Sequence, residues 1–136
     1  IDNGANFVVG PVLNAEVAKV CNRRKIAYSP GCGSVSEISY AEELGCEIIK
    51  IFPGGQVGGP AFVKAVKGPM PWTSIMPTGG VDITEESLKS WFDAGVVCVG
   101  IGSKLITKQL VSEKKWDEIE KNVKAALERI KKVRSG

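Results

Sequence analysis

Short apolar runs alternate with helical patterns along the chain. Each run ends at glycine or proline, which interrupt regular structure and are typical of tight turns. A few residues rich in isoleucine, valine and aromatic side chains between such interruptions are typical of a short strand. The runs that we predict as strands are residues 6–9, 26–28, 47–52, 73–76 and 96–99.

Helical patterns fill the intervals between these strands, and several begin at a capping residue. Ser34 followed by Glu37 fits a capping box, in which the hydroxyl and the carboxylate bind the first free amides of the helix. Gly45 is placed to end the same helix in a left-handed conformation. The expected helices cover residues 14–24, 34–44, 59–67, 82 or 84 to 94, and 112–133.

Strands that are apolar on both faces and alternate with helices indicate a parallel sheet covered by helices. An α/β protein of this kind is either an open, doubly wound sheet or a (β/α)8 TIM barrel. Hydrophobic periodicity does not choose between the two. In both, the active face lies at the carboxyl ends of the strands.

The absence of histidine limits the possible chemistry more than any other feature of the composition. Without an imidazole, neither a Ser-His-Asp nor a Cys-His catalytic arrangement can form, and no histidine can ligate a metal. The cysteines form no C-x-x-C pair, so we expect small buried residues rather than a zinc site or disulfides. They are Cys21, Cys32, Cys46 and Cys98. Chemistry must therefore come from lysine, carboxylates, hydroxyls or backbone amides.

Length and charge fit one globular domain, with 136 residues, 43% of them hydrophobic, and a formal net charge of +3. The basic residues concentrate in the last quarter of the chain, and this small charge is not the signature of a nucleic-acid-binding protein. No apolar run reaches the roughly 18 residues that a membrane helix requires. We expect neither a nucleic acid nor a membrane as a partner.

Lys50 is the strongest candidate for catalysis, because it interrupts an otherwise apolar strand near its carboxyl end. Strand alternation puts Ile48, Lys50 and Phe52 on one face. An apolar environment lowers the pKa of a lysine, and a neutral amine can condense with a carbonyl to form an imine. The alternative is a structural lysine that reaches solvent from a strand end or pairs with a buried carboxylate.

Two glycine-rich loops follow the fourth and fifth predicted strands, at residues 77–81 and 100–103. Glycines allow a phosphate to approach backbone amides, and loops after the last two strands of a barrel often bind phosphate. The alternative is that both loops are only tight turns. Neither matches the dinucleotide fingerprint G-x-G-x-x-G, because Leu105 stands where the third glycine would be.

The ordered motifs resemble those of a known family. Glu-Ile-Ile-Lys-Ile-Phe-Pro-Gly (47–54) is followed by residues 58–69, Met-Pro-Thr-Gly-Gly-Val (76–81) and Val-Gly-Ile-Gly-Ser (99–103). Together they resemble the 2-keto-3-deoxy-6-phosphogluconate (KDPG) / 4-hydroxy-2-oxoglutarate (KHG) aldolases, class I enzymes that work without metal. The similarity runs from about residue 4 to the final helix. It implies a (β/α)8 TIM barrel, a homotrimer, a cytoplasmic enzyme without a cofactor, and a small 2-keto acid as substrate.

The resemblance also implies roles for individual residues. Lys50 would form the Schiff base with pyruvate or the 2-keto acid, and the aldol bond would then be cleaved to give pyruvate and an aldehyde. Phe52 and Pro53 would shape the wall beside the lysine, and Thr78 would lie near the bound keto acid. The residues expected to bind a substrate phosphate are Gly79, Gly80, Gly102 and Ser103.

The chain departs from the family pattern in two ways. The loop that usually reads Pro-Gly-x-x-Thr-Pro-x-Glu has serine for threonine at position 34 and lacks the second proline, at position 35. Only five strand–helix units are present, resembling the fourth to eighth, so we expect residues 1–136 to be the carboxyl-terminal part of one barrel domain. On the order of 65 to 85 residues of a usual barrel would then be missing. They would carry the family's general acid/base glutamate and its carboxylate-binding arginine, so the fragment alone should be inactive.

Two other interpretations stay open at this point. The chain could be a non-catalytic phosphate-binding or assembly module on the same scaffold. It could also belong to another phosphate-binding barrel, such as a thiamine-phosphate synthase, which shares a Gly-Gly turn. A barrel of that type would not need a lysine in the middle of a strand.

Overall fold

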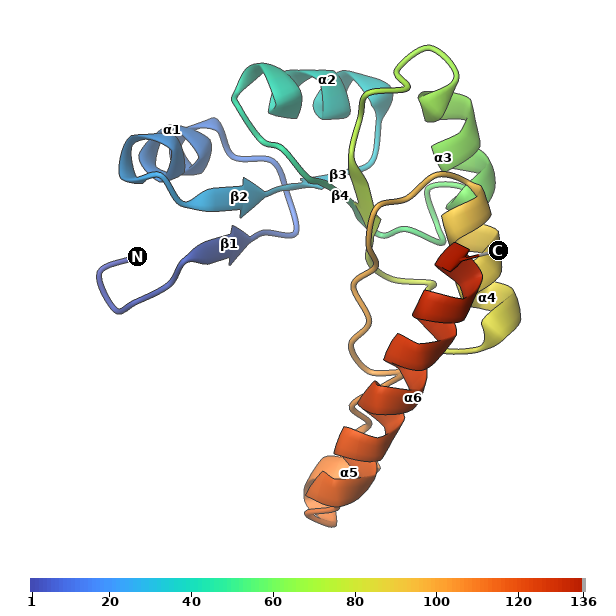
Figure 1. Cartoon of the computed structure of the whole chain (residues 1–136). Helices are drawn as coiled ribbons and strands as arrows, with labels where there is room; N and C mark the ends of the chain where they lie inside the picture. Colours follow the sequence, from blue (N-terminus) through green and yellow to red (C-terminus); the bar gives the residue numbers. More distant parts are fainter. Residues whose placement is uncertain (136) are drawn as a thin grey trace.

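The computed structural model describes residues 1–135 and shows short parallel strands alternating with helices (Figure 1). As far as α4, strands and helices alternate as the hydrophobic pattern predicts, except that β2 and β3 follow each other directly. The elements are β1 (Phe7–Val9), α1 (Ala15–Arg24), β2 (Ala27–Ser29), β3 (Gly31–Cys32), α2 (Val35–Glu43), β4 (Ile49–Ile51), α3 (Gly59–Lys67), β5 (Ile75–Pro77), α4 (Glu85–Asp93), α5 (Lys108–Ser112) and α6 (Trp116–Ser135).

The strands pair in chain order, and every pair is parallel. β1 pairs with β2, while β3, β4 and β5 form a second sheet that begins just beyond Pro30. A doubly wound sheet would instead reverse its strand order at a switch point. Within residues 1–135 no pairing joins β1 to β5, so the array of strands stays open.

The expected strand over residues 96–99 does not form, and this part of the prediction is wrong. The segment still runs beside β5, because Val97 N donates to Ile75 O at 3.0 Å and Gly100 N donates to Pro77 O at 2.9 Å. Between these two bonds the segment advances by three residues and β5 by two, whereas a regular parallel ladder advances equally on both sides. The segment therefore has one residue more than β5 between the two hydrogen bonds, and it does not form a regular strand. Only an isolated bridge joins Thr78 to Gly100.

The helix caps form as predicted. The Asn14 side chain accepts hydrogen bonds from two amides of the first turn of α1. At α2 the Ser34 hydroxyl accepts from Glu37 N, and the Glu37 carboxylate accepts from Gly33 N at 2.8 Å and from the Ser34 hydroxyl at 3.0 Å. This is the reciprocal arrangement of a capping box, displaced by one residue at its backbone donor.

The predicted single helix over residues 112–133 is two helices. α5 begins one turn earlier and is capped by the Thr107 hydroxyl, which accepts from Leu110 N at 3.2 Å. The chain turns at Lys114, whose φ of 54° is in the left-handed region, and α6 then runs back toward α4. In Figure 1 the α5–α6 hairpin extends away from the strands.

The hydrophobic core lies between the strands and their helices. Fully buried side chains come from α2, β4, α3, β5 and α4, namely Ile38, Ile49, Ile51, Val63, Val66, Ile75, Leu88 and Trp91. Cys21, Cys32 and Cys46 are buried as predicted, and Cys98 is half-buried. None of the helices described in residues 1–135 is long and apolar enough to cross a membrane.

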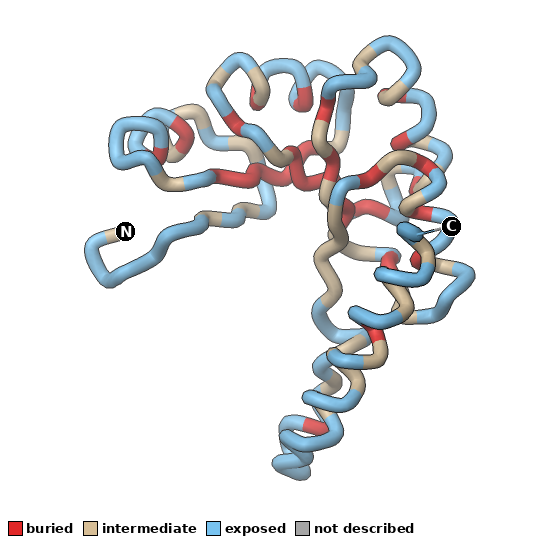
Figure 2. The backbone as a smooth tube through the Cα atoms, in the orientation of Figure 1, coloured by how far each residue is buried: buried red, intermediate tan, exposed pale blue. Residues whose placement is uncertain are grey.

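One face of the strands has no helix over it. Phe7 and Val9 alternate on this face of β1 and are 44% and 46% exposed. Figure 2 shows the same contrast, with buried residues along the central strands and exposed or half-buried ones along β1. The sheet therefore presents apolar side chains on a surface that nothing in residues 1–135 covers.

Candidate active site

Lys50 occupies the centre of β4 between two fully buried isoleucines. In the parallel register it lies opposite Gly31 of β3 and Met76 of β5. Gly31 cannot carry a side chain, because a Cβ there would lie 2.1 Å from Pro11 O. The lysine backbone thus lies between two strands, and the neighbour on β3 has no side chain.

The Lys50 ammonium lies in a largely apolar environment. The residue is only 9% exposed, and its Nζ lies 4.7 Å from the centroid of the Phe52 ring. Among residues 1–135 no carboxylate lies within ion-pair distance of it. Burial lowers the pKa of Lys50, since a charged amine loses its hydration there. Residues 1–135 therefore supply no carboxylate partner for the structural alternative.

The loop after β4 packs directly on the turn after β5. Gly54 N donates to Thr78 O at 2.8 Å, and Gly55 N donates to Gly79 O at 2.9 Å. A Cβ on Gly80 would lie 2.8 Å from the Gly55 Cα, and Gly80 itself has a φ of +80°. The backbone of the chain therefore requires glycine at this position, whatever else the turn binds.

Gly102 differs from those glycines. Its φ lies outside the left-handed region, and a Cβ built there meets no atom within 4 Å. Neither backbone strain nor the packing of the described residues explains a glycine at position 102. An open position in a loop is where a ligand could approach the backbone closely.

These loops enclose a pocket of about 490 Å³ beyond the carboxyl ends of β4 and β5. Its lining brings together six of the residues that the sequence singled out, namely Phe52, Thr78, Gly79, Gly80, Gly102 and Ser103. Lys50 and Pro53 do not line the pocket. The Lys50 ammonium nevertheless lies over the ring of Phe52, and Phe52 lines the pocket.

Sequence reasoning missed two charged residues of this pocket, Asp82 and Lys104. Lys104 Nζ lies 3.5 Å from an Asp82 carboxylate oxygen. A signal was available, because Asp82 directly follows the 76–81 motif and Lys104 directly follows the 99–103 motif. Such neighbours of a loop motif become candidates once the loops are known to face each other.

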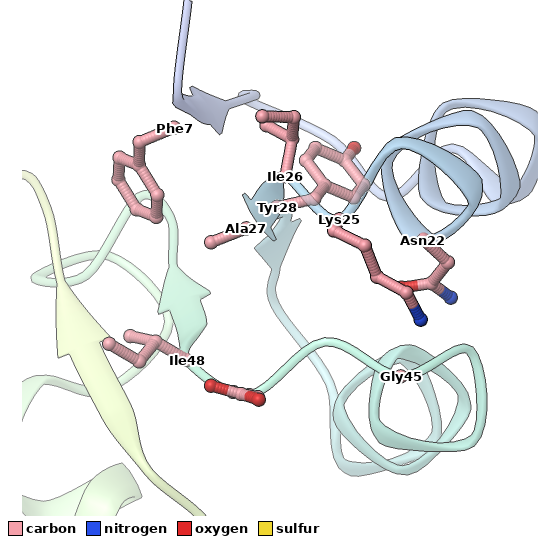
Figure 3. Close-up of a pocket in the computed structure, with 9 residues that line it drawn as sticks. Phe7, Asn22, Lys25, Ile26, Ala27, Tyr28, Gly45 and Ile48 are labelled. Atoms are coloured by element: carbon pink, nitrogen blue, oxygen red, sulfur yellow. The ribbon is translucent and has the colours of Figure 1, made fainter.

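A cavity of about 550 Å³ lies at the opposite ends of the strands (Figure 3). It is bordered by Phe7 and Ala27, the first residues of β1 and β2, and by Ile48, which precedes β4. None of the predicted site residues lines it. Since parallel α/β proteins place their sites at the carboxyl ends of strands, the smaller pocket is the candidate active site.

Comparison with known proteins identifies the class of protein that this fold and lysine define. Residues 1–122 match the family described as "Aldolase: KDPG and KHG aldolase". The chain is 33% identical over 129 residues to the 2-dehydro-3-deoxy-phosphogluconate aldolase of Haemophilus influenzae. It is 36% identical over 127 residues to the enzyme of that name from Pseudomonas aeruginosa. The chain belongs to the KDPG and KHG aldolase family.

The match covers most of this chain and a smaller part of its relatives. It spans 95% of this chain and 60% of the Haemophilus protein, and 93% and 56% in the Pseudomonas comparison. The chain thus spans little more than half the length of these relatives.

Solved structures give the same family and test the alternative barrel. The KDPG aldolase of Legionella pneumophila, captured with pyruvate as a covalent carbinolamine, is 28% identical with a TM-score of 0.80, over 89% of this chain and 58% of that one. A thiamine phosphate pyrophosphorylase from Pyrococcus furiosus aligns with a TM-score of 0.71 at 16% identity, over 96% of this chain and 61% of that one. The second likeness concerns the fold alone.

Proposed function

We propose that this chain is part of a class I aldolase that cleaves 2-keto-3-deoxy-6-phosphogluconate, 4-hydroxy-2-oxoglutarate, or both. The products are pyruvate and an aldehyde, either glyceraldehyde 3-phosphate or glyoxylate. The observation that carries the proposal is Lys50, a buried amine beside a pocket at the strand ends, with no carboxylate partner within the described residues 1–135. The names of the relatives and the pyruvate carbinolamine in the Legionella enzyme support the same chemistry.

In this mechanism the neutral amine of Lys50 attacks the C2 carbonyl of the keto acid, and loss of water from the carbinolamine gives an iminium ion. The C3–C4 bond breaks, its electron pair moves into the iminium to leave an enamine, and the C4 hydroxyl gives its proton to a base as the aldehyde forms. Protonation of the enamine at C3 restores the iminium. Attack of water on C2 then releases pyruvate and regenerates the amine.

The remaining site residues have binding roles in this proposal. Phe52 and Pro53 form the wall beside the amine, and Thr78 contacts the keto acid. Gly79, Gly80, Gly102 and Ser103 bind the phosphate of a phosphorylated substrate through backbone amides and the serine hydroxyl. The open surroundings of Gly102 favour this role most directly, because the packing of the described chain does not require glycine there.

The uncovered apolar face of the strands supports a further part of the proposal. Residues 1–136 form the carboxyl-terminal part of one (β/α)8 TIM barrel, with five of its βα units. The rest of the barrel covers Phe7, Val9 and the other residues of that face, and it carries the base that takes the C4 hydroxyl proton. A homotrimer and a cytoplasmic location are predictions that rest on the family resemblance alone.

Borohydride trapping tests the function on the full-length protein. Borohydride reduces the iminium formed with pyruvate to a stable secondary amine, which mass spectrometry of peptides can assign to one lysine. We expect the adduct at Lys50 and its loss in Lys50→Met, while Lys64→Met, an exposed lysine of α3, retains it. A protein that forms no adduct at any lysine would leave the non-catalytic phosphate-binding module as the better interpretation.

A further inference from the structure

Asp82 and Lys104 both line the candidate active-site pocket, and their charged groups lie beside each other. They come from two different loops, one after β5 and one after the segment that runs beside β5. The two charged groups lie 3.5 Å apart, which is longer than an ordinary charge-assisted hydrogen bond. Their side chains are 68% exposed for Lys104 and 38% exposed for Asp82.

This geometry leaves the lysine free to take another partner. A solvent-exposed ion pair contributes little to stability, so the folded state does not depend on its being formed. An ammonium group has three N–H donors, and a single carboxylate at this distance does not satisfy them. The flexible stem of Lys104 allows its ammonium to turn into the pocket that the residue already lines.

Because Asp82 puts a negative charge at the pocket, an anionic ligand that binds there needs a positive charge nearby. Asp82 borders the same pocket as Gly79, Gly80 and Gly102. A negative charge at this position repels a phosphate dianion that approaches the loop amides. Lys104 supplies the opposite charge, and it directly follows Ser103 in the loop that holds the sterically open Gly102.

We propose that Lys104 is a specificity-determining residue, whose ammonium donates a hydrogen bond to the substrate phosphate and favours phosphorylated over unphosphorylated 2-keto acids. The proposal rests on the proposed aldolase function, since it names which substrates of that site the chain prefers. Lys104 does not take part in imine formation, because its effect is confined to the end of the substrate away from the keto group.

Steady-state kinetics on the full-length protein provide the test. We expect Lys104→Met to lower kcat/KM for 2-keto-3-deoxy-6-phosphogluconate by about tenfold through a higher KM with little change in kcat, as for a lost binding contact. For 4-hydroxy-2-oxoglutarate, kcat/KM should stay the same, and Lys104→Arg should restore much of the lost preference. Lys89→Met is the matched control, because Lys89 is an exposed lysine that pairs with Asp93 on α4 outside the pocket. Equal losses for both substrates, or no loss for either, would overturn the proposal.

A double variant separates direct binding from charge neutralisation. If Lys104 only cancelled the charge of Asp82, adding Asp82→Asn to Lys104→Met would restore the kinetics with the phosphorylated substrate. We expect the double variant to stay impaired, because the hydrogen bond from the ammonium is still absent. Full restoration would overturn the assignment of Lys104 as a phosphate ligand.

Titration with inorganic phosphate keeps this inference separate from the aldolase function. Binding of phosphate can be followed by chemical shift changes at the loop amides, with or without turnover. Weaker phosphate binding in Lys104→Met, together with an intact pyruvate adduct at Lys50, supports both proposals. A missing adduct overturns the aldolase function and the substrate preference, but not the contact between Lys104 and phosphate. Unchanged phosphate affinity in Lys104→Met overturns the role of Lys104 alone.

Discussion

The ammonium of Lys50 lies 4.7 Å from the centroid of the Phe52 ring, two positions further along the same strand end. Two opposing effects therefore act on one amine. Burial lowers its pKa by removing water, while the negative face of the ring stabilises the charged form. Burial is the dominant effect, so the amine is more readily deprotonated than an exposed lysine.

Replacing Phe52 by leucine should lower the pKa of Lys50 further. Leucine keeps the apolar bulk but removes the ring face that stabilises the ammonium. A cation–π contact of about 0.5–1 kcal/mol corresponds to a change of roughly half a pKa unit. The pH midpoint of pyruvate trapping by borohydride in the full-length protein should therefore move to lower pH. Phe7→Leu, at the opposite ends of the strands, should leave that midpoint unchanged; a midpoint that rises in Phe52→Leu contradicts the interpretation.

The lowered pKa of Lys50 also predicts a cost in stability. Because the folded state disfavours the charged amine, the unfolded chain binds the proton more tightly. The penalty is fully present at pH values below the folded pKa and disappears as the pH rises toward the ordinary lysine value. Lys50→Met should therefore raise the free energy of unfolding of the full-length protein at pH 7.

Urea denaturation at several pH values measures this effect. The advantage of Lys50→Met over the unmodified protein should shrink as the pH is raised through the alkaline range. Lys64→Met, which removes an exposed lysine, controls for the loss of one positive charge. If Lys50→Met is less stable than the unmodified protein at neutral pH, the ammonium is better solvated than its burial indicates.

The sequence predicts the position of Lys50 in its strand better than it predicts the regularity of the strand after α4. Alternation places Lys50 and Phe52 on one face, and their contact confirms this. The valine-rich run at residues 96–99 indicates a buried segment, and Val96 is indeed buried. Whether a buried run pairs as a strand depends on its register with β5, which no local pattern records.

Tertiary placement also limits what glycines and charged residues reveal. The amino-acid sequence of the two loops does not distinguish Gly80, where neighbouring atoms exclude a side chain, from Gly102, where the surroundings are open. Asp82 and Lys104 become a pair only because the segment before Gly100 runs beside β5. No glycine or proline marks the break at Lys114, so helix-breaking residues do not predict the division between α5 and α6.

The capping box of α2 should make stability depend on acid pH. Hydrogen bonds from Gly33 N and the Ser34 hydroxyl lower the pKa of Glu37 below its ordinary value of 4.5. The stabilisation is present above that ordinary value and is lost as the pH falls through the folded pKa. Ser34→Ala should lower the free energy of unfolding by about 1 kcal/mol at neutral pH, the usual cost of losing an N-cap.

Glu37→Gln tests the acid dependence separately from the cap hydroxyl. Its free energy of unfolding should fall less steeply between pH 5 and about 3 than that of the unmodified protein, since the variant has no carboxylate to protonate. Glu118→Gln, an exposed acidic residue near the start of α6, is a matched control. An acid profile that is unchanged in Glu37→Gln but altered in the control would contradict this assignment.

The two kinds of glycine should differ in how an alanine substitution changes stability. Gly80→Ala forces a Cβ to within 2.8 Å of the Gly55 Cα at a left-handed φ, so we expect a loss of about 1–3 kcal/mol in the free energy of unfolding. Gly102→Ala meets no protein atom within 4 Å and should leave that free energy nearly unchanged. Its added methyl group instead occupies space beside the pocket, so KM for a phosphorylated keto acid should rise while pyruvate trapping at Lys50 persists. If Gly102→Ala binds inorganic phosphate as well as the unmodified protein does, the open space at this loop is not where the phosphate sits.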